Sequence, residues 1–146
     1  MNLPKTILVA TDFSECAEQA LDYAVALAGK LDAKIHLLNV IGIPSMGIPE
    51  VGIAVTSTLM ESTVRTHHAE LDKLASRRAS ANIETVLRTG DARDLIVDAA
   101  RELGADLIVM GTHGRRGVRR ALIGSIAEGV VRTAPCPVLT IRAHKD

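Results

Sequence analysis

Two short, uninterrupted runs of apolar residues constrain the fold of this chain more than any other feature. The runs are ILVA at 7–10 and LIVM at 107–110. A strand with one face in solvent alternates polar and apolar residues, whereas a strand buried on both faces is apolar throughout. The chain is therefore expected to contain a parallel sheet that is covered by helices on both sides.

Segments with helical spacing separate five segments with strand character. The expected strands are residues 5–11, 33–40, 83–88, 105–111 and 137–142. Helices are expected after the N-cap Ser14, over 59–79, between Asp91 and the stop at Gly104, and from Ser125 to a break at Pro135. Strands joined by helices form right-handed βαβ crossovers. We predict a doubly wound, Rossmann-like α/β fold with five parallel strands in the order 3-2-1-4-5, about four helices and a single domain over 1–146.

Composition and charge argue against nucleic acid or a membrane as the main partner. Lys plus Arg and Asp plus Glu number seventeen each, so no net field attracts a phosphate backbone, and Phe13 and Tyr23 are the only aromatic residues available for stacking on bases. No apolar span approaches the roughly 20 residues of a membrane helix. A domain of this length buries roughly 70% of the surface of its unfolded chain, so one self-sufficient core is expected.

The cysteines and the N-terminal sequence indicate a reduced, cytoplasmic protein. Cys16 and Cys136 are far apart and belong to no CxxC pair, so neither a disulfide framework nor a thiolate zinc site is signalled. The sequence MNLPKTILVATD reaches a charged residue too early for a secretory signal. We therefore expect a soluble protein of the cytoplasm.

Residues 41–55 form a connection that is longer than usual for this class of fold. The segment IGIPSMGIPEVGIAV is rich in Gly and Pro and nearly uncharged, whereas such loops typically have about 2 to 6 residues. Two interpretations are open: a loop that packs its own apolar residues against the domain, and a lid or partner-facing loop. Both place it at the carboxyl edge of the sheet.

A glycine-rich stretch follows the fourth strand and indicates an anion site. Open α/β sheets bind ligands beyond the carboxyl ends of the strands where the strand order reverses, and there Asp12 and the stretch GTHGRRGVRRALIGS at 111–125 should meet. Glycines allow sharp turns with accessible N–H groups, and the start of a helix favours phosphate. Ser125 adds a hydroxyl, and four arginines add positive potential.

Each of these features also has a plainer explanation. Glycines between a strand and a helix are often turn residues, arginines in a loop are often a solvated surface, and Asp12 is equally suited to capping the first helix. The combination carries more weight than its parts.

Other motifs that would indicate a specific chemistry do not occur. The chain has no Walker loop, no GxGxxG, no GxSxG elbow and no pair of histidines or carboxylates at metal-site spacing. His67 and His68 adjoin on one helix and point in different directions, which is typical of a half-buried helix histidine rather than of metal ligands. His113 is the one histidine placed to touch a ligand.

These residues resemble a known family. The spacing Gly111-x2-Gly114-x9-Gly124-Ser125 is similar to the G-x2-G-x9-G-[ST] signature of the ATP-binding universal stress proteins, and Asp12 lies at the tip of the first strand. The segments ILVATDFSECAEQAL, LIVMGTHGRRG and APCPVLTIR also look like strands 1, 4 and 5 of that family. The resemblance covers nearly the whole chain and implies a fold like that of the adenine nucleotide alpha hydrolases.

The resemblance implies a role for each matching residue. The glycine loop and the serine would hold the phosphates of ATP, with any Mg²⁺ carried by those phosphates; Asp12 would contact the ribose, and main chain near Val40 would face adenine. The residues of the implied site are Ala10, Thr11, Asp12, Val40, Met110, Gly111, His113, Gly114, Gly124, Ser125 and Ile126. Ala127 departs from those relatives that carry a hydroxyl there, so the resemblance does not imply a phosphate contact from this residue.

Homodimerisation and a regulatory role are implied as well. The family pairs its last strands antiparallel, and residues 137–142 suit this because only AHKD follows them. We expect a nucleotide-responsive stress module, with an unidentified protein partner as a further possibility. The alternatives are a slow ATP hydrolase or phosphotransferase in the same pocket, for which no catalytic residue follows from sequence, and a scaffold that does not bind ATP.

Overall fold

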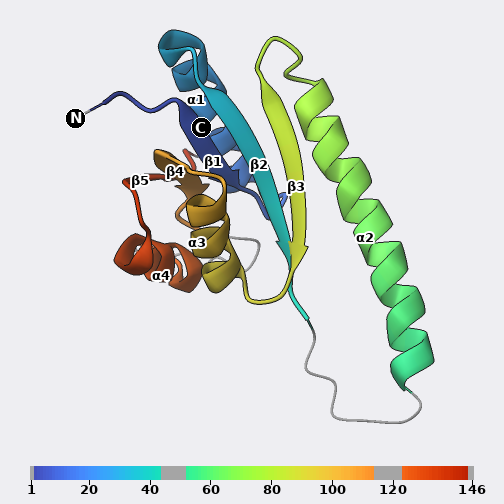
Figure 1. The fold of residues 1–146 in the computed structure, drawn as a ribbon. Coiled ribbons are helices and arrows are strands. Elements are labelled where there is room, and N and C mark those ends of the chain that lie inside the picture. The colour runs from blue at the N-terminus through green and yellow to red at the C-terminus, as the bar shows by residue number, and fades with distance from the viewer. Residues whose placement is uncertain (1, 44–51, 114–122, 145–146) are drawn as a thin grey trace.

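The computed structural model describes residues 2–43, 52–113 and 123–144, and its elements alternate between strands and helices (Figure 1). Side chains of 52–56 are not among those described. The elements are β1 (Thr6–Ala10), α1 (Glu15–Leu31), β2 (Lys34–Ile41), α2 (Gly52–Ser76), β3 (Ile83–Thr89), α3 (Ala92–Glu102), β4 (Leu107–Gly111), α4 (Ser125–Thr133) and β5 (Val138–Ile141).

The five strands form one parallel sheet in the order β3-β2-β1-β4-β5. The predicted fold class and strand order are thus confirmed. β1 lies in the centre, where Ile7 pairs with Ile35 of β2 on one side and with Leu107 of β4 on the other. The strand order reverses between β1 and β4, so the carboxyl ends of these two strands border the point at which this class of fold binds ligands.

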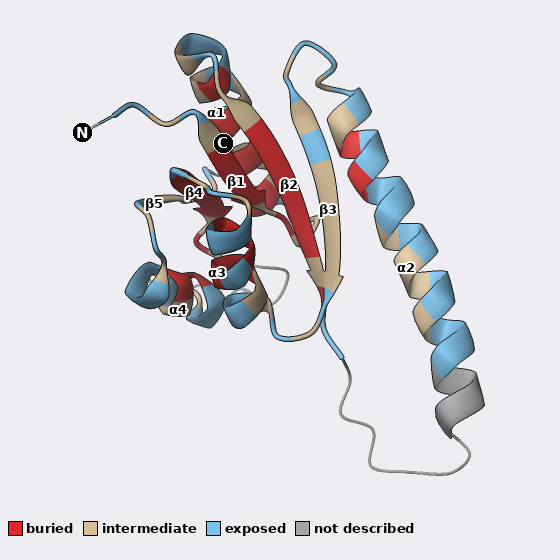
Figure 2. Ribbon diagram, viewed as in Figure 1, coloured by how far each residue is buried: buried red, intermediate tan, exposed pale blue. Residues whose placement is uncertain are grey.

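The helices cover both faces of the sheet, as the apolar runs predict. One core cluster joins β1, β2 and β4 to α1 and to Leu71 and Leu74 of α2, and the other joins the opposite faces of the same strands to α3 and α4. Figure 2 shows the buried residues concentrated in the central strands and on the inner sides of the helices. Ile7, Leu8 and Val9 have no exposed surface at all.

Local signals at the helix ends behave largely as expected. The Ser14 side chain caps α1 by accepting a hydrogen bond from the Ala17 amide at 3.2 Å, and the Asp91 side chain caps α3 by accepting from Asp94 at 3.0 Å. Gly104, with a φ of 64°, follows the C-cap Leu103 in the left-handed conformation that glycine tolerates. The ends of these helices are therefore determined by the local sequence.

The start of α2 differs from the sequence prediction. The helix begins at Gly52 rather than at 59, so residues 52–55 belong to the helix and not to the connection. The reason is that no proline lies between Pro49 and the end of the helix, so a helix anchored at its far end by Leu71 and Leu74 can extend backward to Gly52. Most of the remaining connection, at 44–51, lies outside the described residues, so neither interpretation of it is tested.

Candidate functional site

The carboxyl ends of β1 and β4 lie side by side and border the candidate site. The pairing of Val9 with Val109 places Ala10 next to Met110 at the ends of the two strands. Met110 is buried, and Ala10 and Val40 are partly buried against the same core cluster on the α3 and α4 side. These three sequence-predicted residues therefore share one end of the sheet and one face of it.

Gly111, the last residue of β4, is required by a close approach of α1. A side-chain carbon at this position would lie 2.7 Å from Cys16 Sγ and 3.2 Å from the Cys16 carbonyl carbon. A contact of 2.7 Å essentially never occurs between a Cβ and a neighbouring atom, and one of 3.2 Å to backbone is unusually tight, so a larger residue would push β4 and α1 apart. The glycine thus brings the first turn of α1 against the end of β4, beside the crevice.

Thr112 ties the end of β4 to the start of α4. Its amide donates to the Ile141 carbonyl at 2.9 Å, and its carbonyl accepts from the Gly124 amide at 2.6 Å. Its hydroxyl lies 3.1 Å from His113 Nδ1. Although the two segments are separated by a long stretch of sequence, Thr112 holds His113 and Gly124 next to each other at the site.

Gly124 starts α4 without a side-chain cap. Its backbone is extended, with φ −69° and ψ 161°, and its carbonyl accepts the helix bond from Glu128 at 2.9 Å. A side-chain carbon here would lie 2.8 Å from the Thr112 carbonyl oxygen. The first N–H groups of any α-helix have no partner within it and carry the positive end of its dipole. At α4 these groups belong to Ser125 and Ile126, which are both exposed.

Asp12 lies in a tight turn between β1 and α1. Its Oδ1 accepts a hydrogen bond from the Ser14 amide at 3.0 Å, and Thr11 Oγ1 accepts one from the Phe13 amide at 3.0 Å. Asp12 is therefore not the N-cap of α1, a role that Ser14 fills. Its half-buried carboxylate stands at the tip of β1, as the sequence predicts.

The peptide groups of Val40 face past the end of β1. Along β2, main-chain groups point alternately to the two neighbours: Leu38 O accepts from Thr11 on the β1 side, and Ile41 O accepts from Gly90 on the β3 side. By this alternation the peptide groups of Val40 point to the β1 side, where pairing has ended at Ala10. This direction suits a main-chain contact to a ligand in the crevice.

Some of the predicted site falls outside this description. Gly114 and the four arginines of the stretch belong to 114–122, which lie outside the described residues. Ala127 is 3% exposed, on the side of α4 that packs into the core cluster shared with α3. Within the ranges 2–43, 52–113 and 123–144, no three His, Cys, Asp or Glu residues gather as metal ligands. None of the helices in those same ranges has the length and hydropathy required to cross a bilayer.

Sequence reasoning missed several residues that shape the site. Thr112 was not singled out, although a polar residue directly after a buried strand is a usable signal. Phe13 adopts a left-handed backbone conformation with φ 64° in the turn that carries Asp12, and buried Asn39 bonds to both Thr11 and His67. His67 is half-buried as expected, yet its polar contact to β2 depends on a pairing across 28 residues that no local pattern reveals.

This geometry can be set beside known proteins. The model of the universal stress protein family matches residues 4–142, which is nearly the entire chain. The chain belongs to the universal stress protein family. A universal stress protein of Methanocaldococcus jannaschii is 34% identical over 146 residues, which cover 99% of this chain and 85% of the relative.

Solved structures of the family have the same architecture. The universal stress protein UspA of Lactobacillus plantarum superposes with a TM-score of 0.87 at 29% identity, covering 97% of this chain and all of the other. A universal stress protein of Archaeoglobus fulgidus in complex with dAMP has a TM-score of 0.61 at 25% identity, covering 97% and 99% of the two chains. At least one structural neighbour within the family thus binds an adenine nucleotide.

Proposed function

We propose that this universal stress protein binds ATP at the crevice between β1 and β4 and acts as a nucleotide-responsive regulatory module. The observation that carries the proposal is the uncapped start of α4, which Thr112 holds at the end of β4, the strand that pairs with β1. Uncapped helix N–H groups are a ready-made site for phosphate. The dAMP complex of the Archaeoglobus fulgidus relative supports an adenine nucleotide as the occupant.

Different residues at the crevice would contact different parts of the nucleotide. Ser125 and the first amides of α4 would hold the phosphates with Gly111 and His113 beside them, Asp12 would accept a hydrogen bond from the ribose, and Val40 would offer its peptide to adenine. Three charge-assisted hydrogen bonds contribute roughly 5 to 9 kcal/mol before the entropy of association is subtracted. Contacts to the ribose and adenine add to this sum, and because 1 μM corresponds to about 8 kcal/mol, we expect micromolar to sub-micromolar binding.

The site adjoins a segment through which binding can be communicated. Val40 is followed by Ile41, the last residue of β2, and then by the connection to α2, whose described part includes the 65% exposed Ile43. A nucleotide bound to the peptide of Val40 would therefore lie next to the residue at which this connection begins. We place the regulatory output there, as a change in the surface offered to a partner protein.

The dimer belongs to the same proposal. β5 is an edge strand with β4 as its neighbour, and an edge strand offers unpaired peptide groups to a second copy. Pairing of two β5 strands would cover the β5 edge of each copy.

A charge placed at the start of α4 tests the nucleotide site without weakening the helix. In Ser125→Glu the new carboxylate favours the helix dipole but repels phosphate, whereas Ser125→Gln has nearly the same size and no charge. In titration calorimetry with Mg-ATP we expect Ser125→Gln to bind somewhat more weakly than wild type, because it loses the serine hydroxyl, and Ser125→Glu to bind at least about tenfold more weakly than Ser125→Gln. Absence of binding to wild type, or equal binding to both variants, would refute the site.

A further inference from the structure

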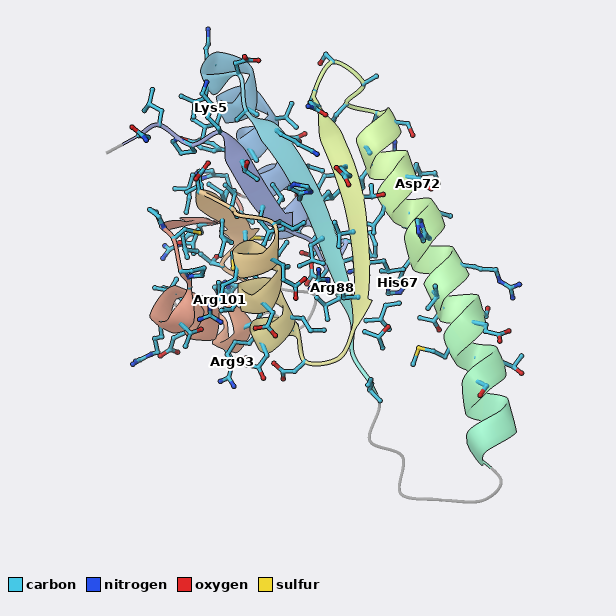
Figure 3. All side chains as sticks on the ribbon, in the orientation of Figure 1. Lys5, His67, Asp72, Arg88, Arg93 and Arg101 are labelled. Atoms are coloured by element: carbon cyan, nitrogen blue, oxygen red, sulfur yellow. The ribbon has the colours of Figure 1, made fainter. Side chains whose placement is uncertain are left out.

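A chain of contacts connects α2 to the turn that carries Asp12. His67 Nδ1 lies 2.8 Å from Asn39 Oδ1, and Asn39 Nδ2 donates to the Thr11 carbonyl at 2.8 Å. The rings of His67 and Phe13 meet edge to face, with centroids 5.3 Å apart and planes at 90°. Figure 3 shows His67 on the side of α2 that faces the sheet. The residues before and after Asp12 are thus both linked to one side chain of α2.

The direction of each hydrogen bond follows from the chemistry of the groups. A backbone carbonyl can only accept, so the Asn39 amide nitrogen must face Thr11 and the amide oxygen must face His67. The oxygen in turn requires a donor, so His67 carries its proton on Nδ1. Because Asn39 is 3% exposed, these two bonds replace the water that its amide would otherwise need.

The turn itself is held in an unfavourable conformation. Phe13 has a φ of 64°, a value that bulky residues rarely adopt and that persists only where surrounding contacts impose it. The Phe13 amide is bonded to Thr11 Oγ1, the Thr11 amide is bonded to Leu38, and the Phe13 ring rests against His67. His67 therefore restrains the turn in two ways. Its ring contacts Phe13 directly, and its hydrogen bond to Asn39 holds the amide that binds the Thr11 carbonyl.

A purely structural role would be served better by apolar residues. The neighbouring positions of β2 on the same face, Ile35 and Leu37, are fully buried aliphatic residues of the core. A buried amide among them contributes little to stability, but it fixes the position of its partners because its bonds are directional. The position that it fixes is that of the Thr11 carbonyl, one residue before Asp12.

We propose that His67 and Asn39 are positioning residues that present the Asp12 carboxylate to the ribose of the bound nucleotide. The inference rests on the nucleotide site proposed above and assigns the ribose part of it to a contact from α2. Neither residue touches the nucleotide. The phosphate part of the site, at the start of α4, is independent of them.

Two substitutions separate the hydrogen bond from the ring contact. His67→Phe keeps a ring against Phe13 and removes the donor, whereas His67→Asn keeps a donor near the place of Nδ1 and removes the ring. The same two changes at His68, an exposed neighbour that pairs with Asp72 at 3.7 Å, are matched controls for any effect on the helix.

Calorimetry with Mg-ATP and with inorganic tripolyphosphate reads out the two parts of the site. We expect His67→Phe to bind ATP about three- to tenfold more weakly, as for the loss of one hydrogen bond, His67→Asn to lose less, and the His68 variants to match wild type. Tripolyphosphate, which lacks a ribose, should bind all variants equally. An equal loss for both ligands would show a general loosening of the fold and would overturn the positioning role.

The same comparison in an Asp12→Ala background shows whether the effect passes through Asp12. We expect His67→Phe to have no further effect on ATP binding there, because the group that it positions is gone. An undiminished effect would overturn the proposal. If wild type binds neither ligand, the nucleotide site fails and takes this inference with it; if wild type binds ATP and His67→Phe binds equally well, the positioning role alone fails.

Discussion

At the scale of single residues, His36 is a titratable side chain that is buried where its charged form is disfavoured. The side chain is 6% exposed, and within the described residues its Nδ1 has no hydrogen-bond partner. Burial lowers the pKa of His36 from its ordinary value of 6.5, and the nearby Lys34 lowers it further, while Glu84 opposes the change. The folded protein thus binds a proton at His36 less readily than the unfolded chain does.

A pH dependence of stability follows from His36. As the pH falls below about 6.5, the unfolded chain binds a proton at this residue before the folded chain does, so the free energy of unfolding decreases until the lower, folded pKa is passed. A tenfold difference in proton affinity corresponds to about 1.4 kcal/mol. We expect His36→Leu to lose less stability than wild type between pH 7 and pH 5 in urea titrations. Parallel curves for the two proteins would contradict this assignment.

Residues whose role is local are predictable from the sequence, and those whose role is set by distant partners are not. Asp12 and Gly124 stand at strand and helix boundaries, which local turn and capping rules predict. Gly111 is also singled out by its position, but the reason for it, the contact with Cys16, emerges only when β4 and α1 pack together. Asn39 looks like any polar residue near a strand end until α2 supplies His67.

At the scale of elements, the turn after α2 is fastened to α1 by one side chain. Arg78 is 11% exposed and donates from Nε to Asp22 Oδ1 at 2.8 Å and from its terminal nitrogens to Glu18 at 3.4 Å and the Leu74 carbonyl at 3.0 Å. The guanidinium is therefore the mostly buried partner of two more exposed carboxylates. It binds the Leu74 carbonyl in the last turn of α2 and ties that end of the helix to α1.

Loss of Arg78 is expected to destabilise the protein measurably. Hydrogen bonds to charged groups contribute about 1.5 to 3 kcal/mol each, less where the partners are exposed, so we expect Arg78→Ala to lower the free energy of unfolding by about 1 to 3 kcal/mol. The adjacent Arg77 is exposed, and Arg77→Ala serves as the matched control. Urea denaturation at low and at high salt should show a difference between the variants that shrinks with salt. Equal urea midpoints for Arg78→Ala and Arg77→Ala would show that the Arg78 contacts between α2 and α1 do not stabilise the protein.

The ends of elements show where pattern reading is limited. The strands and α3 are predicted to within about two residues because apolar runs, caps and a left-handed glycine mark them. The first seven residues of α2 are missed because helix growth depends on how firmly the later turns are packed, which is not a property of the added residues. Composition alone wrongly assigns 52–55 to the preceding connection.

At the scale of the whole molecule, the strand order follows from a few general rules. Apolar runs require a sheet buried on both faces, right-handed crossovers limit the connections, and the order 3-2-1-4-5 then places the crevice between β1 and β4. The structure confirms that order. What these rules do not supply is the contact across layers, from α2 through Asn39 to the turn at Asp12, since it depends on the rotation of a helix over the sheet.

The peptide groups of the edge strand β5 fall into two sets that point in opposite directions. Ile108 donates to the Pro137 carbonyl and Thr112 to the Ile141 carbonyl, so the odd-numbered residues of β5 bond to β4. By the alternation of a parallel ladder, the peptide groups of Val138 and Thr140 point away from the sheet. These are the groups that a second copy would engage in an antiparallel pair.

A proline at position 140 separates dimerisation from folding. Proline is tolerated at an edge position whose N–H faces outward, so Thr140→Pro should keep the ladder to β4 while it removes a donor from the proposed dimer. Thr140→Val keeps the N–H and the β-branched shape and is the control. Light scattering should give twice the chain mass of 15.5 kDa for wild type and the valine variant, and the single chain mass for the proline variant. A proline variant that remains a folded dimer of unchanged stability would contradict β5 as the interface, because the outward ladder would have lost the Thr140 N–H of each copy.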